Sequence, residues 1–169
     1  FMHRTLSLLL LLSGLGLSIL VPGGPVETRD FSHISPIILA LFNSYLTALG
    51  VGSFMLAYFC FQRQRWAFKA AVLAGVSYLW VYAIDLTRVF PTSPTPMPTA
   101  LEVVEILGVL LALPMSIIAT RLACSQPLSM STRRAAGGQR ALILVSGALL
   151  FVLSAGIILF ATLAAMGRL

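Results

Sequence analysis

Charged side chains are scarce in this sequence. They make up 9% of its 169 residues, whereas apolar side chains make up 59%, and soluble domains ordinarily carry about 25% charged residues. This composition excludes a soluble globular domain, so we expect lipid to surround most of the chain. The net charge of +6 does not indicate nucleic-acid binding, because the basic residues are scattered at segment ends and in short loops and do not form one basic face.

Cysteine is also scarce, and the common enzyme motifs are missing. The two cysteines, Cys60 and Cys124, form no C-x-x-C pair, which argues against a thiol-redox enzyme. The sequence contains no P-loop, no H-E-x-x-H zinc motif, no G-x-S-x-G nucleophile motif and no internal repeat. No reaction and no cofactor can therefore be assigned from a motif.

Long apolar segments are what the sequence has in abundance. Five can be distinguished, at residues 5–21, 36–61, 67–90, 100–122 and 141–166. The last four are long enough to cross a hydrocarbon layer of about 30 Å as helices. The first is shorter, and its Arg4 followed by a leucine run also resembles a secretory signal peptide. We predict an all-α integral membrane protein: a compact bundle of five transmembrane helices, or four if the first is cleaved. It forms a single domain over residues 1–169, with no extramembrane domain.

The charges predict how this bundle is oriented. With the N-terminus in the cytoplasm, eight basic residues and no acid fall on the cytoplasmic side, as the positive-inside rule requires. The basic residues on that side are Arg4, Arg63, Arg65, Lys69, Arg121, Arg133, Arg134 and Arg140. All five acids, Glu27, Asp30, Asp85, Glu102 and Glu105, fall on the other side. Ten arginines against one lysine are typical of a GC-rich bacterial genome, so we expect a bacterial inner or photosynthetic membrane.

A polar stripe lies near the non-cytoplasmic end of the third segment. Tyr78, Tyr82 and Asp85 follow i, i+4, i+7 spacing, with Arg88 three residues further, so they share one face of a helix. An ionisable group near the hydrocarbon costs a few kcal/mol unless it is paired, and it is therefore a functional candidate. The simplest interpretation is an ion pair between Asp85 and Arg88.

The fourth segment begins with two acids that differ in depth. Thr99 and Glu102 have the spacing of a capping box, which gives Glu102 a structural role at the helix start. Glu105 lies almost one turn deeper and cannot join that box. We expect Glu105 to approach Asp85 across a short connector, where two carboxyl groups could share a proton or bind a cation.

The first outer loop could complete this site with four more polar residues. Glu27, Arg29, Asp30 and His33 lie within seven residues of one another, but their spacing matches no established metal-ligand motif. We predict a solvated polar loop and no metal site. His3 and His33 fall on opposite sides of the membrane, which argues against a haem held by two histidines of this chain. His33 could still ligate a pigment or cofactor shared with another subunit.

The remaining features concern loops and packing. Four prolines between residues 91 and 99 predict a stiff, extended connector. Residues 124–139 are rich in Ser, Arg, Ala and Gly, which predicts a flexible linker able to contact anionic lipid headgroups. Small residues on the first, second and fifth segments predict close helix packing. Pro114 predicts a kink in the fourth segment.

Two functions remain from different classes. The first is a non-catalytic accessory or structural subunit of a larger inner-membrane complex of electron-transfer or photosynthetic type, packed against partner helices, lipid or pigment. The second is a small ion- or proton-coupled membrane carrier with a carboxylate site in the outer leaflet. A third, weaker hypothesis is an integral lipid-modifying enzyme that uses the same carboxylates. We expect membrane lipids and other membrane subunits as partners, and no nucleic acid.

Overall fold

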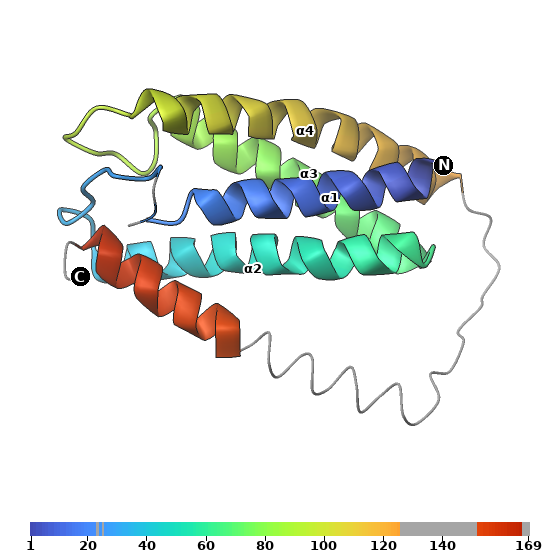
Figure 1. Ribbon diagram of the computed structural model, residues 1–169, viewed down its shortest axis with the longest axis horizontal. Helices are drawn as coiled ribbons and strands as arrows, with labels where there is room; N and C mark the ends of the chain where they lie inside the picture. The colour runs from blue at the N-terminus through green and yellow to red at the C-terminus, as the bar shows by residue number, and fades with distance from the viewer. Residues whose placement is uncertain (23, 25, 126–151, 167–169) are drawn as a thin grey trace.

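The computed structural model describes residues 1–22, 24, 26–125 and 152–166, and helices are the regular secondary structure within these residues (Figure 1). The four long helices are α1 (Met2–Ile19), α2 (Pro36–Phe61), α3 (Arg65–Leu86) and α4 (Thr99–Cys124). A shorter apolar helix, Val152–Ala165, follows near the C-terminus. The predicted all-helical class is confirmed. Residues 141–151 of the predicted fifth segment, and residues 126–139 of the predicted linker, lie outside the described residues.

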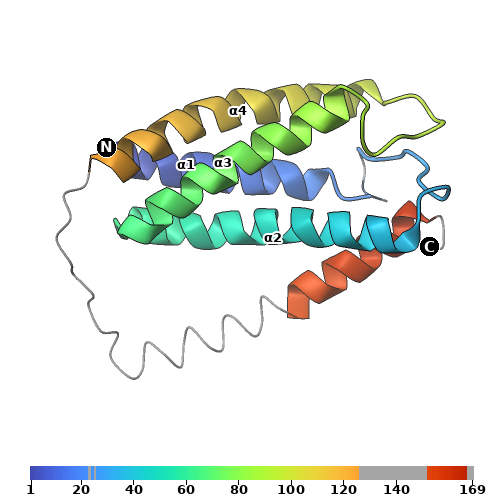
Figure 2. The same cartoon turned by 180° about the vertical axis from the view of Figure 1, so that it is seen from behind.

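The four long helices run antiparallel to their chain neighbours. α1 packs against α2 and α4, and α3 packs against α4 and α2, so the four form a closed bundle (Figures 1 and 2). One end of the bundle holds loops 20–35 and 87–98, and we call it the acidic end. The other end holds the N-terminus, the turn at residues 62–64 and the end of α4, and we call it the basic end. The C-terminal helix Val152–Ala165 lies beside the start of α2 at the acidic end and diverges from α2 toward Val152.

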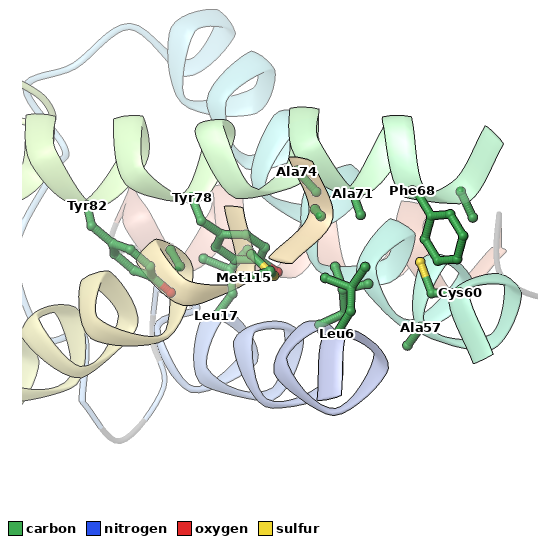
Figure 3. Packing of buried hydrophobic residues seen from close by; sticks show 14 residues of the cluster. Leu6, Leu17, Ala57, Cys60, Phe68, Ala71, Ala74, Tyr78, Tyr82 and Met115 are labelled. Carbon is green, nitrogen blue, oxygen red and sulfur yellow. The ribbon is translucent and has the colours of Figure 1, made fainter. Parts of the chain in front are cut away.

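The core of the bundle follows a repeat of three and four residues. The buried residues of α4 are Leu101, Glu105, Gly108, Ala112, Met115 and Ala119. This spacing keeps one stripe of the helix against its neighbours, as in coiled coils and four-helix bundles. Figure 3 shows the result: Leu17 of α1 lies near Tyr78 of α3 and Met115 of α4, and Leu6 of α1 lies further along the core, toward Ala71 and Ala74 of α3.

Small residues bring the helices close together, as predicted for membrane spans. A Cβ built on Gly14 of α1 would lie 3.2 Å from the Gly50 carbonyl oxygen of α2. A Cβ on Gly75 of α3 would lie 2.3 Å from the Ser116 hydroxyl oxygen of α4. A larger residue at either position would push the helices apart.

The outer surface of the bundle is apolar. Large side chains such as Ile37, Leu73 and Leu110 are between 59% and 72% exposed, whereas soluble proteins rarely expose contiguous apolar surfaces of this kind. All four long helices have the length and composition needed to cross a membrane. These features indicate a multi-pass membrane protein.

The helix boundaries confirm the second predicted segment and correct the third. Helix α2 begins at Pro36, where the missing backbone N–H is not needed. Helix α3 ends at Leu86, four residues before the predicted end at residue 90. Thr87 caps it, and Arg88 has a φ of 56°, a left-handed conformation that terminates helices. The predicted segment extended to residue 90 because Val89 and Phe90 are apolar.

Candidate functional site

A buried arginine organises the acidic end of the bundle. Arg29, in the loop between α1 and α2, is only 8% exposed. Its Nε and Nη2 donate to the two carboxylate oxygens of Glu27 at 2.9 and 2.6 Å. Its Nη1 and Nη2 donate to Oδ1 and Oδ2 of Asp85 on α3 at 2.7 and 2.9 Å. Two bidentate pairs thus use four of the five guanidinium N–H groups, which fixes the loop to α3.

The loop that carries Arg29 is itself anchored to the bundle by packing. The Phe31 ring is 2% exposed and packs with Leu39 of α2 and Ala165 of the C-terminal helix. The Arg29 guanidinium carbon lies 5.2 Å from the centre of the Phe31 ring, within range of a cation–π contact. Burial alone would lower the pKa of Arg29, but the hydrogen bonds to Glu27 and Asp85 reverse this and hold its pKa above the ordinary value. Arg29 is therefore a permanent cation.

A third carboxyl group, that of Glu105, completes the acidic cluster, which we define as Glu27, Arg29, Asp85 and Glu105. Glu105 occupies a core position of α4 and is 2% exposed. Its side chain forms a hydrogen bond with the Asp85 side chain. Among the described residues, no N–H or O–H donor reaches its Oε2 atom. Two carboxyl groups can form such a bond only when one of them carries a proton.

The charges of the acidic cluster do not balance. One guanidinium faces three carboxyl groups, so the cluster stays net negative until it has bound two protons. A small cavity of about 40 Å³ adjoins all four residues. This is room for one ordered water, which needs a polar site of at least about 10–15 Å³. The geometry is suited to taking up and releasing a proton.

Tyr82 forms the wall between the acidic cluster and the core. It is 1% exposed, lines the same cavity and stacks on Tyr78 with ring centres 6.0 Å apart. Figure 3 shows both rings pointing from α3 into the bundle. The Tyr82 ring lies against Gly108 of α4, where an added Cβ would be 2.4 Å from it. Deeper in the core, the Tyr78 hydroxyl bonds to that of Ser53 at 2.9 Å.

Residues 2–137 match a family described as "Domain of unknown function (DUF8051)". The chain belongs to the DUF8051 family. The match covers α1 to α4 and every member of the acidic cluster, whereas the C-terminal helix Val152–Ala165 lies beyond it. No curated protein and no solved structure matches this DUF8051 chain.

The predicted site residues of this DUF8051 chain fall into two groups. The structure brings Asp85, Glu105 and Tyr82 together in the buried site. Arg88, Glu102, Asp30 and His33 are exposed and lie outside the acidic cluster. Within the described residues, no group of three or more His, Cys, Asp or Glu side chains is arranged to hold a metal ion.

Two predicted structural roles are wrong. The predicted ion pair of Asp85 with Arg88 does not form, because α3 ends between them and Asp85 pairs with Arg29. The predicted capping box does not form either. Pro98 is the N-cap residue of α4, with no side-chain cap, and Thr99 already lies in the helix. Glu102 therefore has no cap residue to reach, although as an acid in the first turn it still suits the helix dipole.

The first outer loop was predicted to be solvated, and this is correct for only half of its polar residues. The Asp30 carboxylate accepts bonds from the backbone N–H and hydroxyl of Ser32 at 2.8 and 3.1 Å, and these bonds lower its pKa. Glu27 and Arg29 are buried instead. The sequence signal was present: opposite charges two residues apart form a local pair that is less costly to bury in a chain with few charges.

Proposed function

We propose that this protein crosses a bacterial inner membrane several times, with the acidic end on the non-cytoplasmic side and the N-terminus in the cytoplasm. The positive-inside rule supports this orientation, because Arg4, Arg63, Arg65 and Arg121 all lie toward the basic end. The apolar outer faces of α1 to α4 suit contact with lipid.

Within that membrane we propose a small proton-coupled carrier, in which the Asp85 and Glu105 pair takes up and releases the coupling proton. One observation carries this proposal: Glu105 is almost fully buried against Asp85 and has no donor on Oε2. A purely structural ion pair would need only Arg29 and one or two carboxylates. The third carboxyl group adds a cost in low dielectric, and such residues in membrane proteins mark proton or ion paths.

Proton binding would be coupled to movement through Arg29. In the described state Asp85 accepts two hydrogen bonds from Arg29. A second proton, placed on Asp85, would neutralise the cluster and weaken those two bonds, since charge-assisted bonds are roughly twice as strong as neutral ones. The loop at residues 20–35 would then be held to α3 less tightly, which opens the cavity toward the acidic end. Release of the proton restores both bonds.

The test is proton uptake by the protein reconstituted into liposomes that contain a pH-sensitive dye. Glu105→Gln and Asp85→Asn remove the exchangeable proton with little change in shape, and we expect both to abolish pH-driven flux. Glu102→Gln is the matched control, because Glu102 lies three residues earlier on α4 but is exposed. Equal flux in wild type and Glu105→Gln would refute the proposal.

Infrared difference spectroscopy gives an independent reading of the same site. The wild type should show the carbonyl stretch of a protonated carboxylic acid in a dry environment. Glu105→Gln should shift or remove that band, and Glu102→Gln should leave it unchanged. A wild-type spectrum without such a band at neutral pH would contradict the shared proton.

A second candidate is an accessory subunit of an inner-membrane complex of electron-transfer or photosynthetic type, packed against partner helices, lipid or pigment. The observation that favours it is the C-terminal helix, whose residues Val152, Leu153 and Leu159 are more than half exposed. Purification in a mild detergent distinguishes the candidates. A stable partner that co-purifies in fixed ratio supports the subunit, and a monodisperse single chain supports the carrier.

A further inference from the structure

A second and larger cavity lies beside the acidic cluster. It is a groove of about 540 Å³ between α1, α2 and the C-terminal helix Val152–Ala165, and we call it the lateral groove. Its lining is apolar except for a few residues such as Ser18, Asn43 and Thr47. Along α2 it extends from Asn43 to Phe54, about 16 Å at 1.5 Å per residue. Cavities of about 300–1,000 Å³ are typical of small-molecule sites.

The lateral groove adjoins the small polar cavity of the acidic cluster. Five residues line both cavities, namely Leu17, Leu20, Pro22, Asn43 and Leu46. One molecule could therefore place an apolar chain in the groove and a small polar head beside Glu105 and Arg29.

We propose that the lateral groove binds a single-chain lipid with a small, uncharged, hydroxyl-bearing head, such as a long-chain alcohol. The proposal deepens the proposed function by naming a ligand class, and it rests on that function only for the polar end of the site. The apolar chain lies along α2, and the hydroxyl donates to the Glu105 carboxyl at Oε2, which no donor of the described residues reaches.

The acidic cluster selects this head group by charge and size. Its three carboxyl groups outnumber the single guanidinium, and Arg29 already uses four of its five N–H donors. An anionic head such as a carboxylate or phosphate would meet net negative charge with almost no free donor. The polar cavity of about 40 Å³ also holds little more than one hydroxyl group or water.

The size of the groove argues against a partner helix as the occupant. A helix with side chains is about 10 Å across, so it could not enter the polar cavity of about 40 Å³ that continues the groove. The groove also widens between two elements of the same chain. The C-terminal helix is held to α2 near its end, where Asn43 Nδ2 donates to Thr162 Oγ1 at 3.3 Å, and it diverges toward Val152 (Figure 2).

The test uses the full chain in phospholipid nanodiscs and three photoactivatable probes with the same chain: hexadecanol, hexadecanoate and hexadecane. We expect saturable labelling by the hexadecanol probe on groove residues of α2 and of the helix Val152–Ala165, located by peptide mass spectrometry. Unlabelled hexadecanol should compete, and the hexadecanoate probe should label those peptides about tenfold less. Equal, non-saturable labelling by all three probes would mean ordinary boundary lipid and would overturn the proposal.

Two glycines provide a matched pair of variants. Gly156 lines the groove, Gly52 does not, and a Cβ on either would meet no other atom within 4 Å. Gly156→Phe should therefore fill the groove and reduce hexadecanol labelling about tenfold, whereas Gly52→Phe should not reduce it. Unchanged labelling in Gly156→Phe overturns the proposal. Native mass spectrometry tests the alternative that a second copy of the chain fills the groove. If the wild type shows no saturable labelling but forms a dimer that Gly156→Phe abolishes, the lipid proposal is overturned in favour of that second copy.

The polar end of the site has its own variant. Glu105→Leu removes the acceptor and should abolish the preference for hexadecanol over hexadecane, while hexadecane labelling stays unchanged. A preference that survives in Glu105→Leu would overturn the role of Glu105. Gly156→Phe should keep the carboxylic acid infrared band, so failure of lipid binding and failure of proton exchange are separate results.

Discussion

Arg29→Gln tests whether the acidic cluster holds the first loop on the bundle. Glutamine keeps some hydrogen-bonding capacity but removes the charge and the four guanidinium bonds to Glu27 and Asp85. Hydrogen bonds to charged groups contribute about 1.5–3 kcal/mol each. The sum over the four bonds is an upper bound on the lost free energy of unfolding, because the carboxyl groups left behind can take up protons. Removing one partner of a buried ion pair typically costs about 3–5 kcal/mol, and we expect a loss in that range.

The measurement is thermal unfolding in a mild detergent, followed by circular dichroism. A loss of 3–5 kcal/mol corresponds to a fall in Tm of about 10 °C for a chain of this length. The matched control is Arg88→Gln, because Arg88 is exposed beyond the end of α3. This change should stay within about 0.5 kcal/mol of wild type.

Two further measurements sharpen the argument. Asp85→Asn combined with Arg29→Gln should cost less than the sum of the two single changes, because the pair is then neutral at both positions. The difference in Tm between wild type and Arg29→Gln should decrease as the pH falls toward about 4, where carboxyl groups ordinarily protonate. An Arg29→Gln protein that unfolds at the wild-type temperature at neutral pH would refute the description of Arg29 as the organising residue.

Two predictions concern the core beside the site. Gly108→Ala places a Cβ 2.4 Å from the Tyr82 ring and should lower the free energy of unfolding by about 1–3 kcal/mol. The control Gly52→Ala adds a Cβ that meets nothing within 4 Å and should not lower it. Equal Tm values for the two variants would contradict this packing. The Ser53 hydroxyl already donates to the Leu49 carbonyl at 2.7 Å, so Tyr78 must be the donor in their 2.9 Å bond. Ser53→Ala should therefore lower the free energy of unfolding by about 1–3 kcal/mol, because it leaves the buried Tyr78 hydroxyl without an acceptor. This loss should exceed that of Tyr78→Phe or of the double variant. The reverse order of Tm values would show that the donor is misassigned.

Most of the fold could be predicted from the sequence because hydrocarbon thickness and hydropathy determine where helices cross a membrane. The second segment, residues 36–61, agrees with α2 at both ends. The first, third and fourth segments differ from α1, α3 and α4 by one to four residues at each end, and the largest of these differences is at the end of α3. There the left-handed conformation of Arg88 ends the helix. The pattern of apolar residues gives no information about a backbone dihedral angle, so it could not predict this end.

The candidate site was only partly predictable. Spacing along the third segment placed Tyr82 and Asp85 on one face, because a helix fixes which side chains share a face. The short connector to the fourth segment predicted that Glu105 lies near Asp85. Spacing could not show that Arg29, 56 residues before Asp85, reaches α3 from the first loop. That contact depends on the path of a loop, which Phe31 determines by packing against Leu39 and Ala165. Local rules chose Arg88 as the partner of Asp85 because it is nearer in the chain.

The acidic cluster has a consequence for biogenesis. Its members come from three parts of the chain that leave the ribosome at different times: Glu27 and Arg29 first, Asp85 later and Glu105 last. Glu27 reaches Arg29 two residues away, so the first hairpin can enter the bilayer as a locally neutral unit before α3 exists. Asp85 and Glu105 arrive on a second hairpin and bring the excess acid with them. The complete acidic cluster, with its cation, is therefore absent until the two hairpins meet, and only then does Arg29 reach Asp85.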